Sequence, residues 1–258
     1  MLSRLHAARS RQVDNLPPSR HAPGLPEERN QFSQNTLFLG RGDGTFAEIA
    51  RLAGVAASEW SWTPLFLDVD LDGWEDLLIS NGHELDMMDA DIIEQSERMK
   101  AQKARASNRE LLDLRKMFRR LATPNAAFRN HGNLAFTDVS TAWRFDTESV
   151  THGMAVADLD GDGDLDVVQN NLNAPPTLLR NDASAPRLTI RAAALGGNRQ
   201  AIGARIRVEG GPVPSQTQVI LAGGRYLSSD EPVRTFAARA GARHTVEVRW
   251  PSGRHQVV

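Results

Sequence analysis

The chain has 258 residues, of which 40% are hydrophobic and 24% are charged, and its formal net charge at pH 7 is −2. This composition predicts a globular protein with room for two modest domains, and it excludes a chain too polar to bury a core. The chain contains no cysteine, which excludes disulfides and thiolate zinc sites. No segment approaches the roughly twenty apolar residues of a membrane-spanning helix, so we expect no membrane span.

The first elements along the chain are an irregular segment, a hairpin and a strand. Residues 1–34 are rich in arginine, proline and polar residues without a signal-peptide apolar region, so we predict a poorly structured segment. Apolar residues on either side of Gly42 then predict a hairpin. Short apolar runs at 65–67 and 77–80 predict two strands, and the residues between them are mostly acidic.

This acidic stretch, Asp68–Asp76, has the same pattern of aspartates as Asp158–Asp166. Carboxylates at loop positions one, three, five and nine, with a backbone carbonyl at position seven, are the hard oxygen ligands that Ca²⁺ prefers. Glycine at position six, Gly73 or Gly163, permits the sharp turn because it reaches positive φ without a Cβ clash. Without a cation, so many like charges would repel one another strongly. The sequence therefore predicts two calcium sites.

The alternatives to calcium are weaker. A solvated acidic turn would explain one short Asp-Gly motif, but the complete pattern is rare and occurs twice. Mg²⁺ requires a more rigid octahedral site, and an EF-hand needs a glutamate where the chain has Ile79 and Gln169. The predicted ligands are Asp68, Asp70, Asp72, the Trp74 carbonyl and Asp76 in the first loop, and Asp158, Asp160, Asp162, the Asp164 carbonyl and Asp166 in the second.

Between the two loops, residues 84–123 have a helical pattern. We predict one helix over about 89–104 and a second that begins with the capping box Ser107–Glu110 and continues to Pro124. Its apolar side would consist of Leu111, Leu114, Phe118 and Leu121. This insertion would project from the strand-rich body and either carry a binding surface or cover an open edge.

An internal repeat relates the two loop regions at an offset of 90 residues. The aligned pairs outside the acidic loops are Asn35 and Asn125, Phe38 and Phe128, Gly42 and Gly132, Phe46 and Phe136, and Asn81 and Asn171. Each complete unit has four short predicted strands, which is typical of a β-propeller blade. We therefore predict an all-β fold: a partial, incomplete β-propeller of about two blades with a helical insertion, followed by a small β-rich C-terminal domain.

The motifs also resemble known families. The run 37–46, the acidic loops and Asn81-Gly82-His83 resemble the FG-GAP (VCBS-type) repeats of integrin-α-like propellers. The segments 198–205, 223–228 and 250–253 are similar to the ASPIC/UnbV domain, and the combination resembles the cartilage-acidic-protein family. The resemblance implies a secreted, calcium-loaded propeller without established catalysis.

We divide the chain into the N-terminal segment 1–34, propeller repeats over 35–182 with the insertion at 84–123, and an ASPIC/UnbV-like domain over 183–258. A closed propeller needs about four to eight blades. We therefore expect the chain to be a fragment, with its open edges covered by missing blades and the last domain truncated.

Charge is distributed unevenly. Residues 183–258 contain eleven arginines and four acidic residues, a net charge of +7. These arginines would either bind an acidic glycan or another polyanion, or form ordinary solvated strand faces, and the sequence favours the second. Nucleic acid is not expected as a partner, because no basic and aromatic interleaving accompanies the charge.

The function predicted from these features is a calcium-binding extracellular interaction or adhesion module without catalytic activity. Its partner would be an unknown protein or glycan, and its location extracellular, periplasmic or at the cell surface. His83 and His152 lie in no nucleophile or metal-ligand spacing, so we expect structural roles for them. The alternative is a calcium-bearing ancillary portion of a larger secreted glycan-active or ester-cleaving enzyme.

Overall fold

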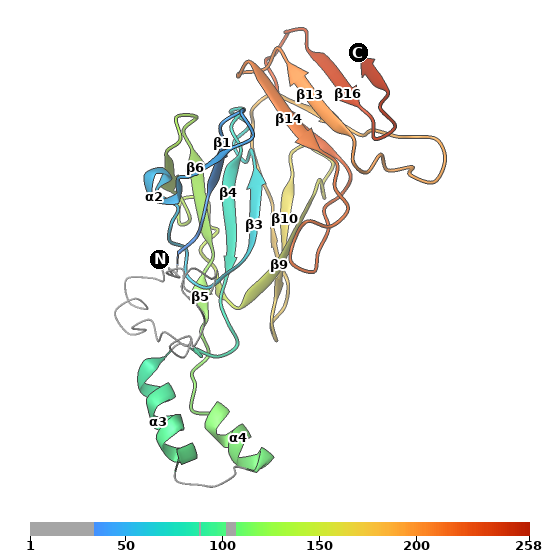
Figure 1. Cartoon of the computed structure of the whole chain (residues 1–258). Helices are drawn as coiled ribbons and strands as arrows, with labels where there is room; N and C mark the ends of the chain where they lie inside the picture. The colour runs from blue at the N-terminus through green and yellow to red at the C-terminus, as the bar shows by residue number, and fades with distance from the viewer. Residues whose placement is uncertain (1–33, 88, 102–106) are drawn as a thin grey trace.

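The computed structural model describes residues 34–87, 89–101 and 107–258. Short antiparallel strands dominate these residues, and two longer helices extend from one end of the molecule (Figure 1). The sheets formed by these residues do not close into a barrel. The all-β prediction is confirmed, and the separate blade-like sheets are consistent with a partial propeller.

The first layer is a hairpin followed by one turn of helix. Its elements are β1 (Phe38–Gly40), β2 (Phe46–Glu48) and α2 (Ala50–Ala53). Ala50, Ala53 and Val55 are buried and pack with Leu77 and Phe128 of the neighbouring sheet. The hairpin predicted around Gly42 is therefore present, and the turn of helix that follows it packs against one face of that sheet.

The central layer is a four-stranded antiparallel sheet with the order β3-β4-β6-β7. The strands are β3 (Ser61–Leu67), β4 (Asp76–Asn81), β6 (Ala126–Asn130) and β7 (Phe136–Asp138). Every residue of β4 is buried, as expected for a strand covered on both faces. The strands pair in chain order despite the insertion between β4 and β6, as the repeat predicts.

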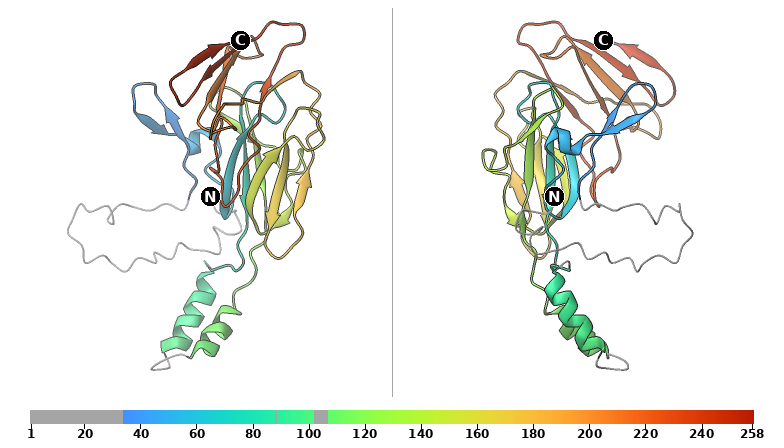
Figure 2. Two further views of the ribbon diagram at one scale, coloured as in Figure 1. Left: turned by 90° about the vertical axis from the view of Figure 1, so that its right-hand side faces the viewer. Right: turned by 60° about the vertical axis from the view of Figure 1, so that its left-hand side comes forward.

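The third layer has the order β11-β10-β9. Its strands are β9 (Thr151–Ala157), β10 (Asp166–Asn171) and β11 (Thr177–Leu179). Leu65 and Leu78 of the central sheet pack with Met154, Val156 and Val167 of this sheet. Figure 2 shows the two sheets side by side, with the β1–β2 hairpin projecting from the side of the central sheet. A two-residue ladder between β5 (Thr123–Pro124) and β8 (Glu148–Ser149) joins the repeats.

The insertion contains α3 (Ala90–Ala101) and α4 (Asn108–Arg115). The predicted capping box is present, because Ser107 and Glu110 bond to each other's backbone N–H groups. The prediction that the second helix continues through Leu121 is wrong. Tight turns follow Arg115, and Leu121 exchanges backbone hydrogen bonds with His83 to close the base of the insertion. None of the described helices has the length and apolarity to span a membrane.

The C-terminal region forms two further sheets at the opposite end of the molecule from α3 and α4 (Figure 1). One pairs β12 (Arg187–Ile190) with β15 (Arg234–Ala237). The other has the order β14-β13-β16-β17, formed by β14 (Ser215–Val219), β13 (Arg205–Glu209), β16 (Thr245–Arg249) and β17 (His255–Val257). Ile206, Val208 and Phe236 form the centre of its own hydrophobic core.

Candidate metal centres

The first acidic loop connects β3 to β4 and is closed by hydrogen bonds from its own backbone. The Asp68 carboxylate accepts bonds from Asp72 N at 3.0 Å and Gly73 N at 2.9 Å. The Asp76 carboxylate accepts bonds from Val69 N at 2.9 Å and from Asn130 N at 2.8 Å. Positions one and nine thus shape the turn and attach it to β6.

Three carboxylates converge in this loop. Oxygen atoms of Asp68, Asp70 and Asp76 all lie within 4.8 Å of one another. Burial raises the pKa of both Asp68 and Asp76 to about 7, and neighbouring carboxylates contribute to each shift. Asp70 Oδ1 is buried and has no hydrogen-bond partner among the described residues. Buried, mutually repelling oxygens are a donor set that fits a hard divalent cation.

Arg129 supplies positive charge beside this group. Its Nε lies 2.6 Å from Asp70 and its Nη2 lies 3.1 Å from Asp72. Sequence reasoning missed Arg129 and its neighbour Asn130, although a signal existed. The same Arg-Asn pair recurs as Arg180-Asn181, but the insertion changes its distance from the acidic loop and hides the correspondence.

The second loop connects β9 to β10 and repeats these contacts. Asp158 accepts bonds from Gly161 N at 2.8 Å and Gly163 N at 3.0 Å. Asp166 accepts bonds from Leu159 N at 2.9 Å and Asn181 N at 2.8 Å. Here the three converging carboxylates are Asp158, Asp160 and Asp162, again with oxygens within 4.8 Å of one another. This group is more exposed than the first.

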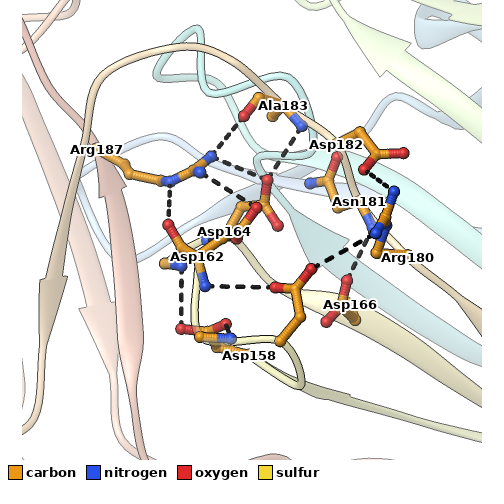
Figure 3. Close-up of polar contacts among 12 residues, drawn as sticks. Asp158, Asp162, Asp164, Asp166, Arg180, Asn181, Asp182, Ala183 and Arg187 are labelled. Carbon is orange, nitrogen blue, oxygen red and sulfur yellow. Dashed lines mark hydrogen bonds and ion pairs between the residues drawn. The ribbon is translucent and has the colours of Figure 1, made fainter.

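Asp164 at position seven has a different neighbour from Trp74. Its side chain is buried and pairs with Arg187 of β12 at 2.9 Å, and Arg187 also lies 3.4 Å from Asp162 (Figure 3). Burial raises the pKa of Asp164 to about 6, with a further contribution from Asp162 that Arg187 opposes. The Asp164 carboxylate therefore belongs to a contact with β12, and only its backbone carbonyl has the predicted ligand role.

Trp74 occupies the same position in the first loop, but its side chain points elsewhere. Its indole packs so closely over Gly132 that an added Cβ there would lie 2.4 Å from Trp74 Cε2. As with Asp164, the side chain makes a structural contact beside the loop, so the predicted metal contact would come only from the carbonyl.

The position-six glycines have the positive φ that the pattern predicts, 97° at Gly73 and 95° at Gly163. Both also lie against the C-terminal region. A Cβ at Gly73 would meet Val213 at 2.8 Å, and a Cβ at Gly163 would meet Thr189 Oγ1 at 3.1 Å. Close approach is therefore a second reason for glycine, and it was not visible in the sequence.

His83 follows the end of β4 and His152 lies near the start of β9, both away from the acidic loops. Their rings pack in a cluster with Trp60, Trp62 and Tyr226. The Trp62 and His152 ring centroids are 4.2 Å apart, and Trp62 and Tyr226 are 4.9 Å apart. The histidines thus join both repeats to the C-terminal region.

Comparison with protein-family models gives matches in the same regions. The FG-GAP-like repeat model matches residues 29–79 and 119–168, each of which contains one acidic loop. The ASPIC and UnbV model matches residues 194–258. No curated protein sequence matches the chain. The chain therefore contains FG-GAP-like repeats, interrupted by a helical insertion and followed by an ASPIC and UnbV domain.

Proposed function

We propose that this chain is a calcium-binding, non-catalytic interaction module that works outside the cytoplasm, with a protein or glycan as its partner. FG-GAP-like repeats are typical of extracellular and surface proteins, and the ASPIC and UnbV family is generally a non-catalytic module. Calcium would rigidify the corners between strands, so that the neighbouring surfaces keep a fixed geometry for binding.

One observation carries the calcium proposal: each loop gathers oxygens of three carboxylates within 4.8 Å of one another. In the first loop, Asp68 forms no ion pair with any described residue, although its carboxylate is buried. A buried carboxylate without a counter-charge is costly, and a bound cation would remove that cost. The donors are all oxygen atoms, which suits Ca²⁺ better than a softer transition metal.

The residues that would hold the ions follow from the loop positions. Bound calcium would supply positive charge that neutralises the carboxylates and links both sides of each turn. The first site would use Asp68, Asp70, Asp72, Asp76 and the Trp74 carbonyl, and the second Asp158, Asp160, Asp162, Asp166 and the Asp164 carbonyl. Arg129 lies beside Asp70 and Asp72, so it would compete with the ion for those two ligands.

The insertion offers one surface for the proposed partner. α3 and α4 extend away from the sheets (Figure 2), and Met99, Leu111 and Leu112 are exposed on them. Exposed apolar side chains on a projecting element suit protein contact better than solvent. Calcium would act on this surface only indirectly, through the rigidity of the strands from which the insertion begins.

Calorimetric titration with Ca²⁺ tests the proposal. We expect two sites in the parent chain, and one site each in Asp70→Asn and Asp160→Asn, because each change removes a central charged ligand. Asp43→Asn is the matched control, since Asp43 is an exposed turn aspartate whose carboxylate bonds Thr45. Calcium at about 100 times its dissociation constant should also stabilise the parent by about 2.7 kcal/mol per site.

The proposal fails if both aspartate variants retain two sites with the parent's affinity. It also fails if calcium leaves the thermal unfolding of the parent unchanged, because a ligand that binds only the folded state must stabilise it.

A further inference from the structure

The outer face of the sheet β14-β13-β16-β17 is exposed and rich in arginine. β13 alternates strictly, with Ile206 and Val208 buried in the domain core and Arg205, Arg207 and Glu209 exposed. This alternation places all three charged side chains on one solvent-facing surface. The sequence alone favours an ordinary solvated face here, and the strand register adds information that the sequence lacks.

The register places basic residues directly opposite one another. Arg205 of β13 pairs with Arg249 of β16, which in turn pairs with His255 of β17. Like charges directly opposite on neighbouring strands are destabilising. Arg205 and Arg249 therefore form a like-charged pair across two strands, which a compensating charge from the protein or from a ligand would stabilise.

The protein supplies only part of this compensation. Glu247 lies 2.7 Å from Arg249 and 2.9 Å from His255, and Glu209 lies 2.7 Å from Arg207. Arg205 makes no ion pair with any residue that the structure describes. The β13 end of the row thus keeps a guanidinium without an ionic partner, beside a second arginine that already pairs with Glu247.

A groove lies over the β13 and β16 part of this row and extends to β14. Its lining residues are Arg205, Arg207, Arg249, Glu247, Ser215 and Thr217. Guanidinium groups bind planar carboxylates and sulfates through paired N–H donors. The Ser215 and Thr217 hydroxyls and the Glu247 carboxylate are suited to hydrogen bonds with neutral hydroxyl groups of the same ligand.

We propose that this groove binds a polysaccharide that carries sulfate or carboxylate groups, with Arg205 and Arg249 as the main anion contacts. Nucleic acid fits less well, because none of the six lining residues is aromatic and exposed bases would have no ring on which to stack. The groove contains neither acidic loop, so its binding is separate from the calcium proposal.

Heparin, which carries both sulfate and carboxylate groups, is the probe. We measure its binding to the full chain in low salt with a calcium chelator present, so that failure of the calcium sites does not affect the result. Arg205→Gln combined with Arg249→Gln should weaken binding by about tenfold or more, because charge-assisted hydrogen bonds are lost. Arg51→Gln combined with Arg109→Gln removes the same charge from exposed positions elsewhere and should change affinity by less than about twofold.

Thr217→Asp is a second test that retains both arginines and adds a negative charge to the groove. It should also weaken heparin binding, and an unchanged thermal midpoint would show that the fold is intact. The proposal is overturned if the two double variants lose affinity equally, if Thr217→Asp binds like the parent, or if single-stranded DNA binds as tightly as heparin.

Discussion

The two acidic loops share one sequence pattern but differ in their surroundings. In both, the first aspartate accepts two backbone N–H bonds and the last joins the turn to an asparagine at the end of another strand. The first loop receives its arginine, Arg129, from its own sheet. In the second loop the equivalent Arg180 approaches Asp160 only at 4.0 Å, and the closer arginine is Arg187 from β12 of the C-terminal region. The repeated pattern therefore determines the shape of the turn, while its electrostatic neighbours depend on what packs against it.

The two loops also differ in the residue at loop position four. Both loops have a positive φ there, 57° at Leu71 and 79° at Gly161. A non-glycine residue in this region costs about 1 kcal/mol or more. The Leu71 side chain is buried, and its burial offsets that cost, whereas Gly161 is exposed and unstrained. The first loop thus buries an apolar side chain at this position, whereas the second has none there and pairs with Arg187 beside it.

Replacing Arg187 or Arg129 should give the largest difference in stability loss between the two loops. Arg187→Gln leaves Asp164, which is only 1% exposed, without its ionic partner. Removing one member of such a buried pair costs about 3 kcal/mol. Arg129→Gln should cost less than about 1 kcal/mol, because the Arg129 side chain is 40% exposed.

Urea unfolding of the calcium-free chain measures this contrast. Arg180→Gln is the control for Arg187, since Arg180 is 65% exposed, pairs with Asp182 on the surface and approaches Asp160 of the same loop only at 4.0 Å. Equal losses for Arg187→Gln and Arg180→Gln would contradict the view that the second loop depends on β12.

Replacing either position-six glycine with alanine should have an intermediate effect on the free energy of unfolding. Alanine at either position adopts an unfavourable φ, which costs about 1 kcal/mol. At Gly73 the new methyl group would also overlap Val213 at 2.8 Å, whereas at Gly163 it would meet Thr189 at 3.1 Å. We expect Gly73→Ala to cost about 2 kcal/mol and Gly163→Ala about 1 kcal/mol.

Thermal unfolding with saturating and chelated calcium measures both glycine variants. Gly42→Ala is the control, because Gly42 has φ +82° with no atom within 4 Å of an added Cβ, so it reports the backbone strain alone. A loss at Gly73 no larger than that at Gly42 would show that contact with Val213 does not constrain the loop.

Local signals explain which features could be predicted from the sequence. The turn glycines, the capping box at Ser107 and the strands on either side of each loop depend on residues close together in the chain. The 90-residue repeat also predicted that β4 and β6 belong to one sheet, although the insertion separates them.

The features that the sequence did not predict depend on contacts between distant residues. Asp76 bonds Asn130, 54 residues later, and Arg187 reaches back to Asp164 from another sheet. The end of α4 was also misplaced, because backbone pairing of Leu121 with His83 outweighs the continuing apolar pattern. In each case a tertiary contact, not a local preference, decides the structure.

The repeat also aligns Trp62 with His152. A change at this pair should have the smallest of the predicted effects, on how stability depends on pH. The two rings are 4.2 Å apart, with His83 and Tyr226 beside them. Burial lowers the pKa of His152 from its ordinary value of 6.5, and His83 contributes to the shift. His152 Nε2 is buried without a hydrogen-bond partner among the described residues, so a proton there would be poorly solvated.

Because the folded chain disfavours protonated His152, the unfolded chain binds this proton at higher pH. The stabilising contribution is therefore complete above about pH 6.5 and is lost as the pH falls toward the lower folded-state pKa. Because Asp68, Asp76 and Asp164 also titrate in this range, the contribution of His152 is the difference between parent and variant. The free energy of unfolding of His152→Gln should rise relative to that of the parent as the pH falls from about 7 to about 5, measured by urea unfolding at constant ionic strength. His131→Gln, an exposed change in the β6–β7 turn, is the control. If both variants keep the parent's pH dependence, the Trp62–His152 contact is not sensitive to protonation, and the two repeats are joined there by packing alone.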